Sequence, residues 1–212
     1  HGKEFFDIKA KFFKYLVETQ DLKVFIMEES YQAESGINEW ISGGKGDIET
    51  IANNFSIAPW YCKEVVNLLE WMRYYNLNKP IEEQIRFYGM DIQNAKQINQ
   101  EIRDFALSNK IPISEELLIV ADSCANKKIE YNKTTDWADI QIPKLKKIEQ
   151  LIIDFQTDNK KESDAVIRSL NYLIKYTYYL QNSRSVVRDL KMFENVKWII
   201  DNKTKNGKAF IW

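Results

Sequence analysis

Carboxylates stand at the ends of two short apolar runs, and their type and position suit chemistry. Glu28 and Glu29 follow the run Val24–Met27, and Asp91 follows the run Arg86–Met90. If both runs are parallel strands, their carboxyl ends meet at one edge of a sheet, where ligands of open α/β sheets bind. Two neighbouring carboxylates raise each other's pKa and can hold a base, a metal or a cationic ligand. The structural alternative is that Asp91 caps the following helix and Glu29 is solvated.

Histidine and cysteine are too rare for several other kinds of site. The 212 residues include one histidine, His1, and two cysteines, Cys62 and Cys124. A zinc site built on two imidazoles is therefore excluded within this chain, and a Ser-His-Asp triad would have to use His1. The cysteines form no CxxC motif, so we expect buried thiols in a reducing, cytoplasmic compartment. We expect no cofactor.

The charges nearly cancel, with 30 Lys and Arg against 31 Asp and Glu. A nucleic-acid partner is not indicated, because such proteins usually carry a basic patch and an excess of positive charge. No apolar stretch approaches the ~18 residues that a membrane span needs, so we expect no membrane partner. Hydrophobic residues make up 44% of the chain, which is typical of a globular protein. The sequence does not indicate an oligomeric state.

The elements that would position the carboxylates alternate between helices and strands. Helical spacing first places Phe5, Ile8, Phe12 and Leu16 on one face. A third apolar run, Ala209–Trp212, completes a small parallel sheet with the two runs above. The helix before that run is predicted to pack on the sheet through three apolar residues, Leu190, Phe193 and Val196. The other helical patterns between the first two strands cover residues 37–41, 48–53 and 62–75.

The middle of the chain is predicted to form a helical hairpin or bundle. No glycine occurs from Met90 to Asn206, and glycine costs ~1 kcal/mol against alanine inside helices. Ser114 and Ser163 each precede acidic residues and are predicted to be N-caps. Two prolines, Pro112 and Pro143, are predicted to separate the helices. The fold class is therefore α/β and predominantly helical, with a core of residues 1–93 and 182–212 and a helical insertion of residues 94–181.

The glycine-rich segment Ser42–Asp47 superficially suggests a phosphate-binding loop. It fails the Walker pattern, because no Gly-Lys-Ser/Thr opens a helix there and no strong strand precedes it. We predict instead a glycine-rich helix end followed by Asp47 as the next N-cap. In the last helix, Arg188 and Asp189 belong to a charged face that is solvated by default, but they could lean over the strand ends.

Six segments in the same order resemble the erythromycin esterase family. Each motif is weak alone, but together they extend from the first residue to the last. They are His1–Phe6 (its His-Gly…Glu-Phe-Phe opening), Phe25–Glu28 (its first apolar strand ending in Glu), Gly43–Asp47 (its Gly-Gly-x-Gly-Asp turn), Glu64–Arg73 (its helix before the second strand), Arg86–Asp91 (its Phe-Tyr-Gly-x-Asp strand) and Arg188–Val196 (its Arg-Asp-x-x-Met-x-Glu-Asn helix).

The resemblance implies a hydrolase that cleaves a small-molecule ester, a macrolide lactone or a related substrate. It implies that His1 activates water as a general base, with Glu28 in the same cleft. With Asp91, these residues form the predicted catalytic set. The resemblance also matches Lys9 to a basic residue of the family that is typically Arg. The predicted substrate-binding residues are Lys9, Glu29 and Arg188.

The family pattern also continues beyond both ends of the sequence. Its Gly-Glu would precede His1, and its Ala-His-Asn-x-His would follow Trp212. We therefore expect an internal fragment that is inactive alone. Two alternatives remain open: a non-catalytic helical binding or scaffold module, and a metal-binding relative that uses Glu28 and Asp91 as oxygen ligands.

Overall fold

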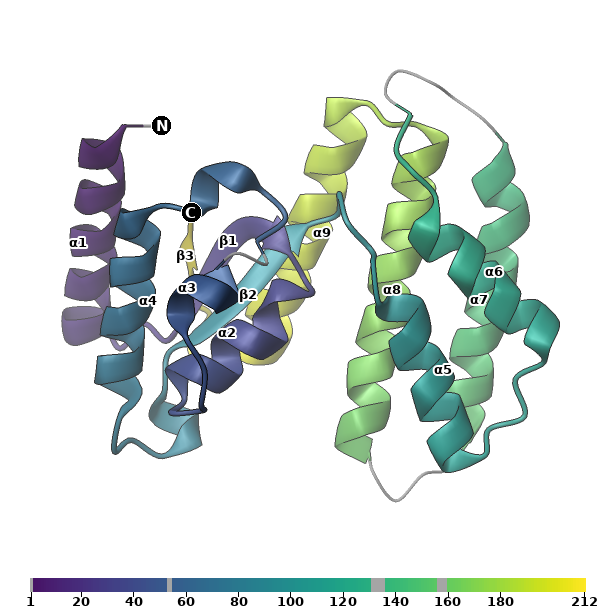
Figure 1. Ribbon diagram of the computed structural model, residues 1–212, viewed down its shortest axis with the longest axis horizontal. Coiled ribbons are helices and arrows are strands. Elements are labelled where there is room, and N and C mark those ends of the chain that lie inside the picture. Colours follow the sequence, from purple (N-terminus) through teal and green to yellow (C-terminus); the bar gives the residue numbers. More distant parts are fainter. Residues whose placement is uncertain (1, 53–54, 131–135, 156–159) are drawn as a thin grey trace. The chain divides into compact units, whose positions relative to one another are not determined.

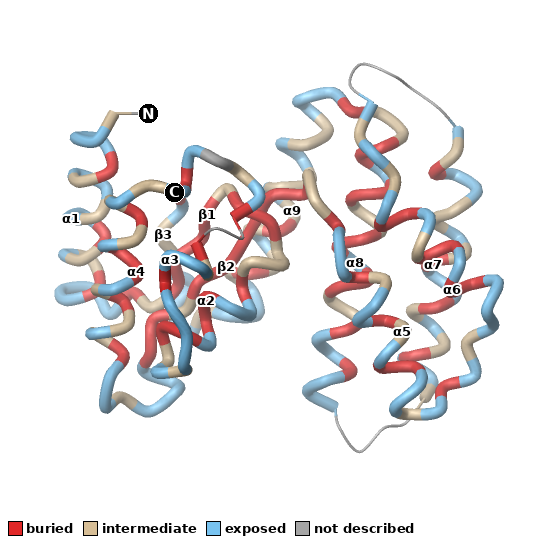
Figure 2. Tube along the Cα trace, viewed as in Figure 1, coloured by how far each residue is buried: buried red, intermediate tan, exposed pale blue. Residues whose placement is uncertain are grey.

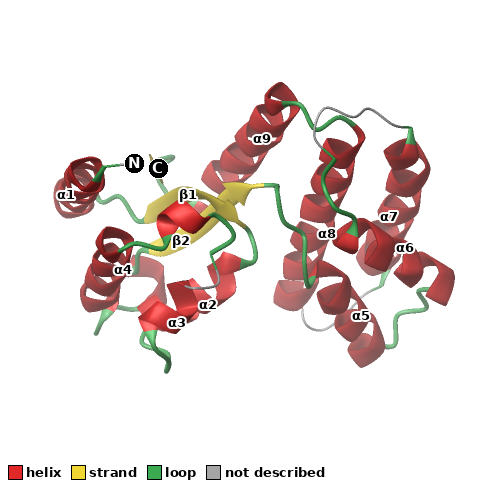
Figure 3. Cartoon of the chain, turned by 45° about the horizontal axis from the view of Figure 1, so that its top comes forward, coloured by secondary structure: helices red, strands yellow, loops and turns green. Residues whose placement is uncertain are grey.

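The computed structural model describes residues 2–52, 55–130, 136–155 and 160–212. They form two compact units, one made of His1–Asp91 with Met192–Trp212 and the other of Ile92–Lys191. The first unit holds a three-stranded parallel sheet, and the described elements of the second are helices (Figures 1 and 3). The predicted fold class, α/β and predominantly helical, is confirmed.

The elements follow one another as helices and short strands. In chain order they are α1 (Lys3–Gln20), β1 (Val24–Ser30), α2 (Ala33–Ile41), α3 (Ile48–Ala52), η1 (Ala58–Trp60), α4 (Lys63–Asn76), η2 (Ile81–Glu83), β2 (Arg86–Asp91), α5 (Ile98–Asn109), α6 (Glu115–Asn126), α7 (Trp137–Asp154), α8 (Lys160–Gln181), α9 (Ser185–Lys203) and β3 (Phe210–Ile211).

The strand order is β2-β1-β3, and β1 pairs in parallel with both neighbours. Phe25 lies opposite Phe87 of β2 and Phe210 of β3, so three aromatic rings line up across one face of the sheet. The ring centroids of Phe25 lie 6.0 Å from Phe87 and 5.9 Å from Phe210, both in stacked orientation. Aromatic cross-strand contacts of this kind help fix the register of a sheet.

The outer edge of β2 is closed by asparagine side chains from the helices. The amide of Asn38 in α2 donates to the Phe87 carbonyl and accepts from the Phe87 N–H, at 2.7 and 2.8 Å. Asn76 at the end of α4 makes the same pair of bonds with Ile85. Each asparagine therefore satisfies backbone groups that would otherwise be open to strand addition at this edge.

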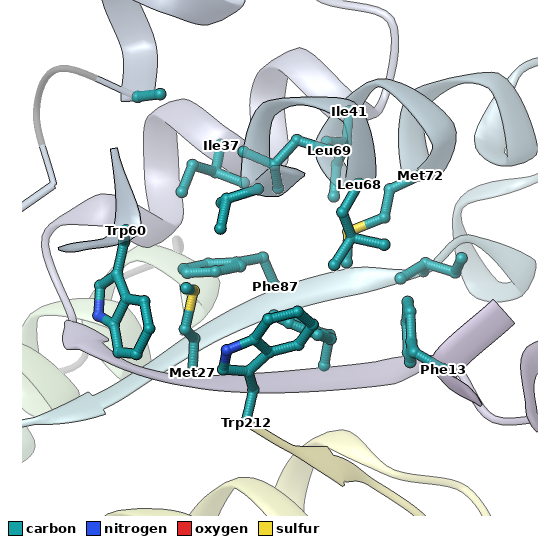
Figure 4. Close-up of a cluster of buried hydrophobic side chains, with 14 of the residues drawn as sticks. Phe13, Met27, Ile37, Ile41, Trp60, Leu68, Leu69, Met72, Phe87 and Trp212 are labelled. Carbon is teal, nitrogen blue, oxygen red and sulfur yellow. The ribbon is translucent and has the colours of Figure 1, made fainter. Parts of the chain in front are cut away.

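Helices cover both faces of the sheet. Side chains of α1, α2 and α4 pack on one face against Phe25, Met27 and Phe87 (Figure 4). On the other face, α9 packs against Val24, Ile26, Tyr88 and Met90. The residues of α9 and its following loop that make this contact are Met192, Val196, Trp198, Ile199, Ile200 and Ala209.

The predicted packing residues of α9 need correction, and the apolar face recognised in α1 is not its buried face. Of the three residues predicted for α9, Val196 does face the sheet, but Leu190 is 52% and Phe193 62% exposed. In α1, the buried residues are Phe6, Phe13 and Val17, whereas Phe5, Ile8 and Phe12 are largely exposed. Apolar residues lie on more than one side of each helix, so periodicity alone did not select the buried one.

The glycine-rich segment is a helix connection, as predicted. It joins α2 to α3, and Asp47 Oδ2 accepts from the Thr50 N–H at 3.0 Å, which makes Asp47 the N-cap of α3. The guanidinium of Arg73 donates to the carbonyls of Trp40 and Gly44 and lies over the Trp40 ring. The guanidinium of Arg73 in α4 therefore fixes the backbone of this loop.

The second unit contains α5 to α8, and each of these helices carries buried residues (Figure 2). Ser114 is the N-cap of α6, as predicted. Ser163 and Pro143 were predicted wrongly, because both lie inside helices, α8 and α7 respectively. The two prolines therefore differ: Pro112 does separate α5 from α6, but Pro143 is accommodated within α7.

Cysteine burial is partly as expected. Cys124 in α6 is fully buried, and this burial raises the pKa of its thiol to about 11 despite a hydrogen bond to Thr177. Cys62 precedes α4 and is half-buried. Among the described residues, the structure has no helix with the length and apolar character to cross a bilayer.

Candidate active site

The predicted carboxylates lie at the carboxyl ends of neighbouring parallel strands. Met27 pairs with Gly89, and the next pair is Ser30 with Asp91, so β1 has one more residue than β2 in this interval. Glu28 and Glu29 form the resulting β-bulge. They therefore lie within β1 rather than after it. Bulges are frequent next to active sites, because they redirect side chains at the end of a strand.

Gly89 of β2 leaves room for the bulge. A β-carbon at this position would lie 2.5 Å from the carbonyl oxygen of Glu29 and still closer to that of Ser30. Only glycine allows the two backbones to approach this closely. The Gly89 N–H faces the opposite side, where the buried carboxylate of Glu34 in α2 accepts its hydrogen bond at 2.9 Å.

The Glu29 side chain is fully buried and accepts hydrogen bonds from its own chain. Oε1 accepts from the N–H of Ser30 at 2.6 Å, from the N–H of Ser56 at 3.0 Å and from the Ser56 hydroxyl. Oε2 accepts from the Ile57 N–H at 3.2 Å. The structural alternative, in which Glu29 is solvated, is wrong, because the 55–57 segment covers this carboxylate.

Glu28 differs from Glu29 in that its side chain is only half-buried. Its backbone is held on both sides. The Glu28 N–H donates to the Trp212 carbonyl at 3.2 Å, and its own carbonyl accepts from the Trp60 indole N–H at 2.6 Å. Figure 4 shows Trp60, Met27 and Trp212 near one another around this end of the sheet. Glu28 therefore presents a carboxylate from a fixed backbone.

The site prediction from the sequence did not include Trp60 or Trp212. Both are buried, and the Phe6 ring contacts both, with centroids 6.0 Å from Trp60 and 5.5 Å from Trp212. Trp60 lies in the short η1 turn, where no periodicity marks it. The signal that could have suggested Trp212 was its place at the end of the third strand, beside the predicted strand ends of Glu28 and Asp91.

Asp91 is the last residue of β2 and is fully buried. It does not cap the following helix, because α5 begins seven residues later and its N-cap is Gln97. That part of the structural alternative is therefore wrong. The preceding residue, Met90, is fixed by the Asn195 side chain of α9, which donates to the Met90 carbonyl at 2.9 Å. Asp91 and Glu28 thus share one edge of the sheet.

The remaining predicted residues fall in three different settings. Lys9 lies on α1, with its Nζ 5.1 Å from the centroid of the Trp212 ring, and so belongs to the same end of the first unit. Arg188 is half-buried in α9 and belongs to the second unit. His1 lies outside the described residues. The catalytic and substrate-binding roles of the six predicted residues stay predictions.

This arrangement can perform polar chemistry at the sheet edge. A half-buried carboxylate on a rigid backbone can orient a water molecule, stabilise a cation or fix the tautomer of a neighbouring imidazole. Within the part of the chain that the structure describes, no three side chains of His, Cys, Asp or Glu come together as a metal-binding group.

Comparison with known proteins identifies the family. A sequence model of the family "Erythromycin esterase" matches residues 17–212, which is most of the chain. This chain belongs to the erythromycin esterase family. The matched region of this family member contains both parts of the sheet edge, the bulge of β1 and the end of β2. The resemblance inferred from the six motifs is thereby confirmed.

Solved structures share the fold of this erythromycin esterase family member at low sequence identity. A Bacillus cereus protein superposes with a TM-score of 0.78 and 20% identity over 98% of this chain. A succinoglycan biosynthesis protein gives 0.74 and 19% over 99%, and a mutant of the erythromycin esterase EreC in its open conformation gives 0.63 and 15% over 98%.

The match covers 52%, 53% and 56% of those three solved chains, respectively, so this family member spans about half their length. A search of curated proteins found no match.

Proposed function

We propose that this chain is part of a hydrolase that cleaves a small-molecule ester, with the reaction at the carboxyl edge of the β2-β1-β3 sheet. A macrolide lactone is one candidate substrate, and related esters are others. Membership of the erythromycin esterase family supports the reaction class. The observation that carries the location is the half-buried Glu28 carboxylate, held at a bulge beside the buried Asp91.

In this proposal, His1 acts as the general base. Its imidazole takes a proton from water as the water oxygen attacks the ester carbonyl. When the tetrahedral intermediate collapses, the imidazolium returns this proton to the oxygen of the departing alcohol. Glu28 stabilises the imidazolium that forms and fixes its tautomer. Asp91 acts from the neighbouring strand end and keeps this edge of the sheet polar. The net reaction adds one water molecule and yields an acid and an alcohol.

A cation of the first unit is proposed to bind the substrate. Lys9 lies over the Trp212 ring at the same end of the first unit, where an ammonium can attract a carbonyl or carboxylate oxygen. Lys offers a point charge rather than a two-pronged contact, so we assign it an electrostatic role.

In the active protein, turnover of the Glu28→Gln variant tests this proposal. Gln keeps the shape of the side chain and removes its charge, so ester hydrolysis, followed as the appearance of acid and alcohol, should fall at least about tenfold. The free energy of unfolding should change little. Glu70→Gln, an exposed residue of α4, is the matched control and should retain full turnover. Equal turnover of both variants would contradict the assignment of Glu28.

A further inference from the structure

We infer that Glu29 is a positioning residue, which holds the Ser56–Trp60 segment on the β1 bulge and thereby fixes the backbone that carries Glu28. This inference replaces the predicted substrate contact of Glu29. Its consequence for turnover rests on the proposed function, whereas its structural content does not.

The Glu29 carboxylate joins two segments that are far apart in sequence. It accepts from the N–H of the next residue, Ser30, and from the successive N–H groups of Ser56 and Ile57. The Ser56 hydroxyl donates to the same oxygen as its own N–H. Successive backbone N–H groups that point at one anion form a strong binding arrangement for it. A single buried side chain therefore anchors the 55–57 segment to the sheet.

The anchored segment returns to the residue beside Glu29. The Trp60 N–H donates to the Ile57 carbonyl at 3.0 Å, which closes the η1 turn. The indole of Trp60 then donates to the Glu28 carbonyl at 2.6 Å. A continuous chain of hydrogen bonds thus leads from the Glu29 carboxylate through Ile57 and Trp60 to the Glu28 backbone.

The two adjacent glutamates differ in burial, and we infer that their roles differ accordingly. Glu29 has no exposed surface, whereas the Glu28 side chain is half-buried. An ionised carboxylate offers about four acceptor positions, and four donors of the chain already contact Glu29. Contact with a substrate therefore falls to Glu28, and the contribution of Glu29 is to keep Glu28 in a defined place. Such preorganisation matters because small displacements of a reacting group cost rate.

Hydrogen exchange of the Glu29→Gln variant, measured by NMR on the chain, tests the inference. Gln keeps the volume and one acceptor oxygen, but its amide nitrogen cannot accept. The amides of Ser56 and Ile57 should exchange about tenfold faster or more. The decisive signals are the Trp60 indole N–H and the Glu28 amide, because neither bonds to Glu29. Both should also lose about tenfold protection if the segment positions Glu28.

Unchanged protection of the Trp60 indole and the Glu28 amide would overturn the inference, since Glu29 would then only hold its own loop. Glu34→Gln is the matched control, because Glu34 is another buried carboxylate that accepts a backbone N–H at this sheet. It should affect the Gly89 amide and leave the Trp60 indole protected. If Glu29→Gln does not fold, Ser56→Ala removes only the hydroxyl donor and should weaken the same two signals by a smaller factor.

Turnover separates positioning from general structural damage. In the active protein, Glu29→Gln should lower kcat with little change in KM, and it should cause no further loss in a Glu28→Gln background. A structural defect would lower kcat by the same factor in both backgrounds and would refute the link to Glu28. If the exchange pattern appears in a protein that hydrolyses no ester, the positioning is supported and only the proposed function fails.

Discussion

The backbone of Glu29 passes directly over Gly89, so a β-carbon on Gly89 would lie 2.5 Å from the Glu29 carbonyl oxygen. The glycine of β2 and the bulge of β1 are therefore one structural feature. The bulge places a second glutamate at the strand end, and the close approach requires that the neighbouring strand carry no side chain there.

Gly89→Ala should consequently destabilise the first unit. The added β-carbon would meet the backbone carbonyl oxygens of Glu29 and Ser30. A backbone oxygen cannot rotate away, so the strands must separate or the bulge must move. Such overpacking costs about 1–3 kcal/mol or more in free energy of unfolding, measurable by urea denaturation. Gly36→Ala, inside α2, is the control, because the added β-carbon would lie 3.9 Å from the nearest atom, a side-chain carbon of Ile51. That variant should be as stable as the native protein or more so, and a tolerated Gly89→Ala would show that the bulge is adaptable.

His1→Asn should remove most ester hydrolysis if His1 is the general base. Asn has polar atoms of similar reach but cannot take up a proton, and general-base catalysis contributes about 10²–10⁴-fold. Initial rates of ester cleavage measure the effect. The thermal unfolding midpoint, measured in parallel, distinguishes loss of the general base from loss of the fold. Full activity of the variant would assign the base to another group.

Glu101→Gln should stabilise the second unit at neutral pH. Desolvation of the carboxylate raises the pKa of Glu101, although the residue as a whole is exposed, and the hydrogen bond from the Ser169 hydroxyl opposes this shift only in part. Between the ordinary and the raised pKa, the native state binds more protons than the unfolded state, so native stability falls as the pH rises.

The Glu101→Gln variant does not lose stability in this way as the pH rises, because Gln does not ionise. Its thermal unfolding midpoint should exceed that of the native protein at pH 7. The difference should shrink below about pH 4, where Glu101 becomes protonated in the unfolded state as well as in the native state. Glu116→Gln, an exposed position of α6, provides the comparison and should show no such pH-dependent gain. A gain at pH 7 that persists unchanged at low pH would point to a cause other than ionisation.

The sequence by itself determined the order of elements and the edge of the sheet where the carboxylates lie. The apolar runs Val24–Met27 and Arg86–Met90 could be recognised because buried parallel strands are continuously hydrophobic, and the glycine-free middle because glycine is costly in helices. The family could be recognised because its motifs are local and occur in a fixed order.

Only the tertiary structure decided what each carboxylate at that edge does. Glu28 and Glu29 are chemically identical neighbours, and the bulge that distinguishes them depends on β2, some 60 residues later. The burial of Glu29 depends on Ser56 and Ile57, and the backbone of Glu28 on Trp60 and Trp212. These partners carry no local pattern, because a hydrogen bond between distant segments is set by how the chain packs rather than by the periodicity of either segment.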